Sequence, residues 1–214
     1  MNYKQQLVQA GRDMLEKKLT VETWGNLSLR DPDTGRIYLT PSAMPYSTIT
    51  EEDVVVLEPD GSLFEGRRKP TVEKDLHVKV YQNRPDVNAI IHTHPVESLV
   101  FGVLHEDIPP IIDEAAQILG GTVHTAKYAL PGTQSLAENC LEALGVKGRA
   151  CLLANHGAVC LGKDMKDAFK TSAVLEMTAE IYRKARSLGE PVVIDEHQVA
   201  FMRDFMENHY GQDK

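Results

Sequence analysis

The segment Ala89-Ile90-Ile91-His92-Thr93-His94-Pro95 is a short apolar run that ends in two histidines. The β-branched pattern over residues 87–94 is typical of a buried strand. Side chains at positions i and i+2 of a strand project to the same face, about 7 Å apart along the backbone. We therefore expect His92 and His94 to point into one space, where they could bind a single divalent ion.

A third histidine follows another apolar strand pattern. His156 comes shortly after the apolar residues 151–154 and directly before Gly157. Three neutral imidazole nitrogens with an open coordination position are typical of a catalytic rather than a structural metal site. Buried histidines that only form hydrogen bonds would give the same pattern, so the sequence pattern predicts a metal centre only together with its neighbouring motifs.

Two further features could serve such a centre. Glu73 stands at the start of a predicted helix, where a carboxylate is favoured by the helix dipole whether or not it has a catalytic role. If that helix start faces the metal, Glu73 becomes a general acid/base with a pKa moved toward neutrality. The turn segments 24–28 and 40–45 carry small and hydroxyl residues that could surround a phosphate, although ordinary hairpin turns use the same residues.

The remaining pattern predicts mixed helices and strands. Helices are expected over residues 3–19, 73–81, 96–103, 135–144, 165–188 and 198–208. Further strands are expected over residues 26–29, 36–40, 53–57, 122–126, 150–154 and 158–161. This arrangement indicates an α/β layered domain with a central, mostly antiparallel sheet. Because no internal repeat or linker-like tract occurs, we expect residues 1–214 to form a single domain.

Composition excludes several classes of protein. Hydrophobic residues make up 42% and charged residues 25% of the 214 residues, as in soluble globular proteins. No apolar stretch approaches the ~20 residues that span a bilayer, and the N-terminus lacks the features of a signal peptide. The net charge of −8 argues against binding to nucleic acid phosphates. The three scattered cysteines are typical of reduced core residues, so we expect a cytoplasmic protein.

Six ordered motifs together resemble the class II aldolase/adducin family, most closely its L-fuculose-1-phosphate aldolase branch. The likeness extends from about residue 5 to Tyr210. The motifs are Gly-Asn-Leu-Ser (25–28), Thr-Pro-Ser (40–42), Lys-Pro-x-x-Glu (69–73) followed by His77, His-Thr-His-Pro (92–95), Pro-Gly-Thr (131–133) and Asn-His-Gly (155–157).

The resemblance implies a three-layer α/β/α sandwich, the class II aldolase fold, in a C4 homotetramer with active sites at the subunit interfaces. It implies a lyase that cleaves a ketose 1-phosphate, L-fuculose 1-phosphate or a related deoxy-sugar, to dihydroxyacetone phosphate and a short aldehyde. The implied cofactor is Zn²⁺, with Mn²⁺ or another divalent ion as alternatives.

The resemblance also implies roles for residues at matching positions. The metal ligands fall on His92, His94 and His156, with Glu73 as proton donor/acceptor and additional ligand. Tyr210 matches a catalytic family tyrosine. The phosphate-binding positions are Gly25, Asn26, Ser42, Ala43, Thr71 and Val72.

Departures from the family pattern leave alternatives open. The family usually has two serines where Thr71 and Val72 stand, and glycine in place of Ala43. The acid/base at the leaving aldehyde is Asp113, Glu114 or Tyr210. The alternatives to an aldolase are a methylthioribulose-1-phosphate dehydratase-like lyase and, from another class, a non-catalytic adducin-like structural module. The complete histidine set argues against the structural module.

Overall fold

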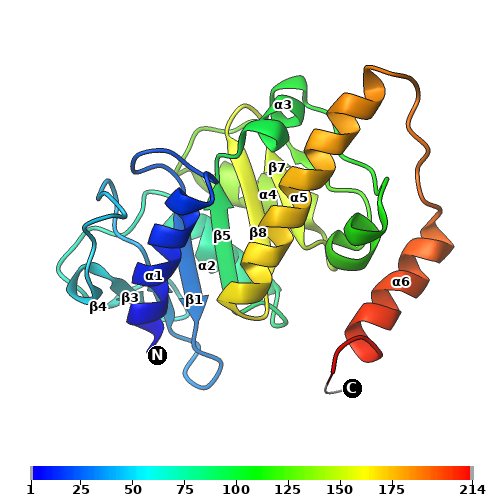
Figure 1. The fold of residues 1–214 in the computed structure, drawn as a ribbon. Helices are drawn as coiled ribbons and strands as arrows, with labels where there is room; N and C mark the ends of the chain where they lie inside the picture. Colours follow the sequence, from blue (N-terminus) through cyan, green and yellow to red (C-terminus); the bar gives the residue numbers. More distant parts are fainter. Residues whose placement is uncertain (1, 213–214) are drawn as a thin grey trace.

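A single sheet of eight strands crosses the computed structural model, which describes residues 2–212 (Figure 1). The strand order is β4-β3-β2-β1-β5-β8-β7-β6, and all neighbours are antiparallel except the parallel pair β6–β7. The strands are β1 (Asn26–Arg30), β2 (Ile37–Leu39), β3 (Val55–Leu57), β4 (Leu63–Glu65), β5 (Ala89–Thr93), β6 (Thr125–Ala126), β7 (Ala150–Leu153) and β8 (Gly157–Gly162). The two histidine-bearing segments therefore lie next to each other, because β5 pairs with β8.

Helices cover both faces of this sheet. Helices α1 (Tyr3–Glu16) and α5 (Met165–Arg186) pack on one face, and α2 (Lys74–Asn83) and α4 (Gln134–Leu144) pack on the other (Figure 1). The predicted α/β/α sandwich is thus confirmed. The remaining helical elements are η1 (Glu51–Asp53), α3 (Val96–Leu104), the π-helical turn η2 (Ala115–Leu119) and α6 (Glu196–Asn208).

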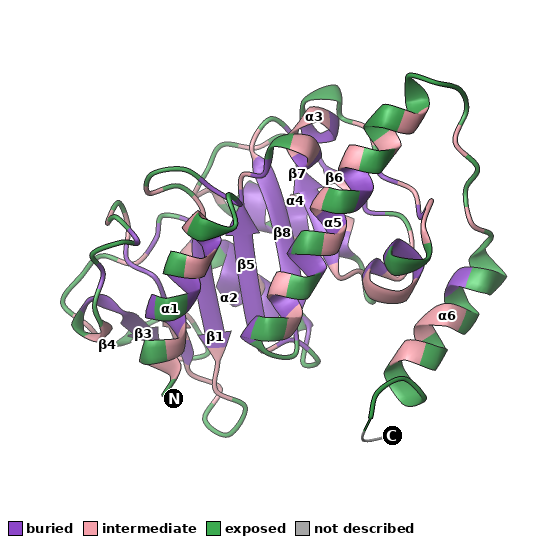
Figure 2. Cartoon of the chain, viewed as in Figure 1, coloured by how far each residue is buried: buried purple, intermediate pink, exposed green. Residues whose placement is uncertain are grey.

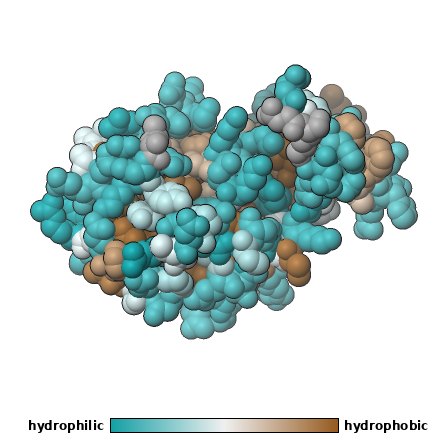
Figure 3. All heavy atoms as spheres, turned by 90° about the horizontal axis from the view of Figure 1, so that it is seen from below, coloured by the Kyte–Doolittle hydropathy of each residue, from teal (hydrophilic) through white to brown (hydrophobic). Residues whose placement is uncertain are grey.

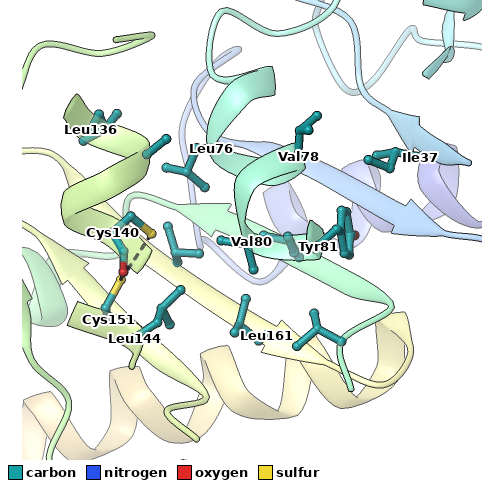
Figure 4. Close-up of a cluster of buried hydrophobic side chains, with 14 of the residues drawn as sticks. Ile37, Leu76, Val78, Val80, Tyr81, Leu136, Cys140, Leu144, Cys151 and Leu161 are labelled. Atoms are coloured by element: carbon teal, nitrogen blue, oxygen red, sulfur yellow. Dashed lines mark hydrogen bonds between the residues drawn. The ribbon is translucent and has the colours of Figure 1, made fainter. Parts of the chain in front are cut away.

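Buried side chains concentrate on the sheet and on the helix faces that meet it (Figure 2). Strands β5, β7 and β8 are buried along their whole length, as expected for central strands covered on both faces. Figure 4 shows the cluster between the sheet and the α2–α4 layer, in which Cys140 and Cys151 lie side by side. All three cysteines are free and buried, as the sequence predicted.

The surface seen from below is mostly hydrophilic (Figure 3). Figure 3 shows the underside of the molecule as oriented in Figure 1, where hydrophilic residues cover most of the surface and apolar ones form small patches. Within residues 2–212, no helix has the length and apolar character needed to cross a bilayer.

Most elements occur where periodicity predicted them, and the differences have simple reasons. Strand β4 was not predicted because all three of its side chains are exposed, so that no burial pattern marks it. The expected strand over residues 122–126 is shortened to Thr125–Ala126 at the sheet edge. The turns η1 and η2 are too short to give a helical period in the sequence.

Candidate metal centre

The end of β5 places two imidazoles against each other. His92 is fully buried, and its Nε2 lies 3.1 Å from Nε2 of His94. The backbone N–H of His94 donates to the carbonyl of Leu19, which fixes the chain just beyond the strand. The predicted i, i+2 convergence of the two side chains is therefore present.

His156 joins the pair from the turn between β7 and β8. One ring nitrogen from each of His92, His94 and His156 lies within 4.8 Å of the others. Such a spacing is close to that of three ligands of one ion, because metal–nitrogen bonds of ~2.0–2.1 Å at tetrahedral angles place the ligand nitrogens ~3.4 Å apart. Among the described residues, the buried atoms His156 Nδ1 and Glu73 Oε1 have no hydrogen-bond partner. The donor set fits a divalent ion that prefers nitrogen ligands.

The local backbone orients His92 for ligation. Its Nδ1 lies 3.0 Å from the carbonyl oxygen of Ala158 and donates its proton there, so that in the neutral ring Nε2 carries the lone pair that a metal ion needs. Gly157 allows the start of β8 to approach the end of β5 this closely, because a Cβ at position 157 would lie 2.4 Å from the carbonyl oxygen of Thr93. The glycine of the Asn-His-Gly motif is thus required by packing at the centre.

Glu73 reaches the same point from the start of α2. Its Oε2 lies 3.1 Å from Nε2 of His92, and its Oε1 lies 3.4 Å from Nε2 of His156. The residue is 5% exposed, and its side chain does not cap the helix. The carboxylate therefore faces the histidines, which is the arrangement that the sequence left open.

The electrostatics of Glu73 differ from the expectation. Burial alone would raise the pKa of Glu73. The charge of His92 and the hydrogen bonds that the Glu73 carboxylate accepts from His92 and Asn26 instead hold this pKa well below its usual value. The prediction of a pKa moved toward neutrality was therefore wrong, because the positive neighbours outweigh burial.

Burial favours neutral rings at the other positions. It lowers the pKa of His94 to about 3 and that of His156 to about 4, with a further contribution from the charge of His92. For His92 burial acts in the same direction, but the neighbouring Glu73 carboxylate raises its pKa overall. Neutral imidazoles are the form that binds a metal ion.

Behind Glu73 lies a buried chain of hydrogen bonds. Asn26 Nδ2 donates to Oε2 of Glu73 over 2.8 Å, and Asn26 Oδ1 lies 2.5 Å from Nε2 of His77. His77 Nδ1 lies 2.6 Å from Oγ of Ser28, which in turn lies 2.8 Å from the hydroxyl oxygen of Tyr81. Ser28 was expected to lie in a phosphate-binding turn over residues 24–28, but it lies in strand β1 and faces His77, and Tyr81 had no predicted role. Their positions at i+2 from Asn26 and i+4 from His77 are the signal that could have indicated them.

The predicted phosphate segments also come together. Residues 40–43 lie beside residues 69–73, since the N–H of Ser42 donates to the carbonyl of Lys69 and that of Thr71 donates to the carbonyl of Thr40. Gly25 has φ +73°, and a Cβ there would lie 2.5 Å from the carbonyl oxygen of His92. Gly25, just before β1, therefore brings the first phosphate segment directly against the backbone of the metal ligand His92.

Within these segments the side chains differ in accessibility. Asn26 and Thr71 are buried, and Asn26 Nδ2 also donates to Oγ1 of Thr71. Val72 is 64% exposed, and Ala43 is exposed with φ 54°, a left-handed conformation that favours glycine. The family glycine at this position is thus replaced by a residue under backbone strain.

Other candidate residues lie apart from the histidines. Tyr210 follows α6 and is 61% exposed, and no described contact joins it to the centre. Asp113 and Glu114 are exposed just before η2. Trp24, for which the sequence predicted only a place in a turn, stacks on His94 with ring centroids 6.4 Å apart and borders the centre.

This combination of fold and site defines a class of enzyme. Residues 5–183 match the family described as "Class II Aldolase and Adducin N-terminal domain", and the chain belongs to this family. It is a class II aldolase, and so a lyase, with the divalent-metal dependence of that class. The predicted class II aldolase fold is confirmed.

Individual relatives narrow the comparison. The chain is 34% identical over 209 residues to 5-deoxy-D-ribulose 1-phosphate aldolase of Bacillus thuringiensis serovar kurstaki, covering 98% of this chain and 97% of that protein. It is 32% identical to L-fuculose phosphate aldolase of Escherichia coli K12, covering 91% and 89% respectively. A solved structure of an L-fuculose 1-phosphate aldolase superposes with a TM-score of 0.93 at 36% identity and 96% coverage of both chains.

Proposed function

We propose that this enzyme cleaves a ketose 1-phosphate, either L-fuculose 1-phosphate or a 5-deoxypentulose 1-phosphate, to dihydroxyacetone phosphate and a short aldehyde. The observation that carries this proposal is the convergence of His92, His94, His156 and the Glu73 carboxylate beside loops suited to phosphate. The names of the relatives support a phosphorylated deoxy-sugar, and they include both substrates.

For the cofactor we propose Zn²⁺, with Mn²⁺ or another divalent ion as alternatives. His92, His94 and His156 hold it, and Glu73 is an additional ligand when substrate is absent. When bound, such an ion supplies Lewis acidity toward the oxygens of the substrate carbonyl and the adjacent hydroxyl. The all-imidazole set with an adjacent carboxylate supports this assignment, since catalytic zinc sites keep one position open.

The roles proposed for the protein's own residues follow from their places. Glu73, after taking up a proton from solvent, delivers it to the carbon of the dihydroxyacetone phosphate fragment once the C3–C4 bond has broken, because its carboxylate lies at the histidines. Tyr210, Asp113 and Glu114 are the candidates for removing the C4 hydroxyl proton. The phosphate group is held by backbone N–H groups and side chains of Gly25, Asn26, Ser42, Ala43, Thr71 and Val72.

We further propose a cytoplasmic C4 homotetramer in which residues 1–214 form one domain. The continuous eight-stranded sheet supports a single domain, although Met1, Asp213 and Lys214 lie outside the described residues. The exposure of Tyr210 supports an interface site, because a residue remote from its own centre can act at that of a neighbouring subunit. Closed cyclic symmetry follows, since identical head-to-tail contacts must close or polymerise.

The test is an assay of the Zn²⁺-loaded enzyme with a panel of pentulose and hexulose 1-phosphates. Coupled detection of dihydroxyacetone phosphate reports aldol cleavage. A dehydratase would instead give a product that has lost water but kept all its carbon atoms. The proposal is wrong if no ketose 1-phosphate in the panel releases dihydroxyacetone phosphate.

A further inference from the structure

Helix α2 and strand β1 face each other through two regular series of polar residues. Glu73, His77 and Tyr81 follow the i, i+4, i+8 period of one helix face, and Asn26 and Ser28 follow the i, i+2 period of one strand face. Four helical residues rise about 6 Å and two strand residues about 6.6 Å, so the two series can interleave. They do so in the order Glu73–Asn26–His77–Ser28–Tyr81.

The chemistry at one end sets the direction of every hydrogen bond in this chain. An ionised Glu73 only accepts, so Asn26 turns its Nδ2 toward Glu73 and its Oδ1 toward His77. That oxygen also only accepts, so the proton of the neutral His77 ring is on Nε2. Nδ1 then accepts from the Ser28 hydroxyl, and Ser28 accepts from the Tyr81 hydroxyl.

All five residues are at most 5% exposed, which leaves this chain sheltered from solvent. A reversed Asn26 amide would set its Oδ1 against the Glu73 carboxylate and its Nδ2 against a ring N–H, which is unfavourable at both contacts. His77 is therefore the group that keeps the Asn26 donor aimed at Glu73. It has no described contact with the three metal-site histidines.

We propose that His77 is a positioning residue for the aldolase reaction: as the Nε2–H tautomer it locks the Asn26 amide, which holds the Glu73 carboxylate in place for proton transfer. This inference rests on the proposed function for its catalytic consequence, while the tautomer and the amide orientation do not depend on it. Glu73 thereby keeps one oxygen anchored while the other, Oε1, stays free of hydrogen bonds.

Two substitutions of His77 separate positioning from packing. His77→Gln keeps a donor near the position of Nε2, whereas His77→Met fills similar space without one. We expect His77→Met to lower kcat by roughly 10- to 100-fold, the range found when groups behind a metal site are changed. KM and bound metal should change little, and His77→Gln should recover most of kcat. Thr171→Val is the matched control, since it removes a buried hydrogen bond on the opposite face of the sheet.

A second measurement uses the unmutated, metal-loaded enzyme and needs no turnover. Nitrogen-15 NMR of the histidine rings, with the His77 signal assigned from its loss in His77→Gln, should show a proton on Nε2 and a bare Nδ1 nitrogen. A proton on Nδ1 would overturn the inference, and so would equal activity of the Met and Gln variants. If the enzyme cleaves no ketose 1-phosphate, the proposed function fails, and the tautomer alone decides whether His77 orients Asn26.

Discussion

The two halves of the active site are built in different ways. The metal half lies at the ends of β5 and β7 and at the start of α2, where His92, Glu73 and the adjoining Asn26 are all at most 5% exposed. The phosphate half consists of turns, in which Val72 and Ala43 are exposed and Ala43 has a left-handed backbone conformation. The difference teaches that the positions of the metal-site side chains are fixed by core packing, whereas part of the phosphate site lies in exposed turns that the core does not hold.

The largest effect expected from breaking this arrangement comes from His92→Ala. The remaining ligands hold an ion poorly, so the variant should bind little metal and lose more than roughly 10⁴-fold in kcat/KM, exceeding the loss of a single acid/base. Elemental analysis and turnover measure both effects, and a chelator should reproduce the loss in the unmutated enzyme. His124→Ala, which removes an exposed histidine, is the control. Full metal occupancy in His92→Ala would contradict the ligand assignment.

The next effect concerns Glu73→Gln, which keeps the side-chain shape but removes the titrating group. We expect kcat to fall by roughly 10²–10⁴-fold, as for a lost general acid/base, while the histidines retain the metal. The control Glu58→Gln makes the same change at a half-buried carboxylate that pairs with Arg36 and does not contact the histidines. If Glu73 only favours the helix start, turnover will stay near normal and stability will drop by about 0.3–1 kcal/mol.

The residues behind these two predictions were not equally predictable from the sequence. The convergence of His92 and His94 was predictable from strand alternation, because positions i and i+2 project to the same face, but a metal centre was predictable only together with the neighbouring motifs. The central strands and long helices were predictable for the same reason, since their burial patterns are regular. The family motifs indicated His156 and Glu73, but not that Glu73 would turn away from its helix start toward the ring nitrogens.

Contacts between distant segments were not predictable in this way. The link from Asn26 to His77 joins positions 51 residues apart, and it depends on how α2 lies across β1. Local periodicity does not specify that crossing. The sign of the Glu73 pKa shift also depends on a balance of burial and charge that needs coordinates. Strand β4 also pairs with β3 although its three side chains are exposed, so no burial pattern in the sequence indicated this pairing.

A smaller effect is expected in the pH dependence of the folding stability. Burial lowers the pKa of His77 to about 3, below the ordinary histidine value. The unfolded chain therefore binds this proton first as pH falls, and the folded state loses stability between about pH 6.5 and pH 3. Well below pH 6.5, the stability of the unmutated protein should fall by up to about 1.4 kcal/mol per pH unit more than that of His77→Gln.

Urea unfolding at fixed protein concentration, with metal removed from both proteins, measures this difference. The two proteins should show equal pH dependence above pH 7, where the ring is neutral in both states. Parallel curves over the whole range would show that His77 titrates freely in the folded protein.

The smallest effect is expected from a substitution in the phosphate half. Ala43→Gly should raise stability by about 1 kcal/mol, since a left-handed conformation costs an alanine roughly 1–2 kcal/mol and glycine gives back part of this as chain entropy. Ala200→Gly is the matched control, because the same change in the exposed interior of α6 should lower stability by roughly 0.5–1 kcal/mol. Thermal unfolding compares them. A loss of stability in Ala43→Gly would mean that this turn is not strained.

The pairing of β1 with β5 has a consequence for how the enzyme matures. Asn26 stands opposite His92 and Ser28 opposite Ile90, while Leu27 and Leu29 pack on the α1 side of the sheet. A slip of one residue would send both leucines toward α2 and both polar residues into an apolar layer. A chain misassembled in this way is therefore unstable as well as inactive, so protein quality control that senses only exposed apolar surface also removes molecules with a faulty active site.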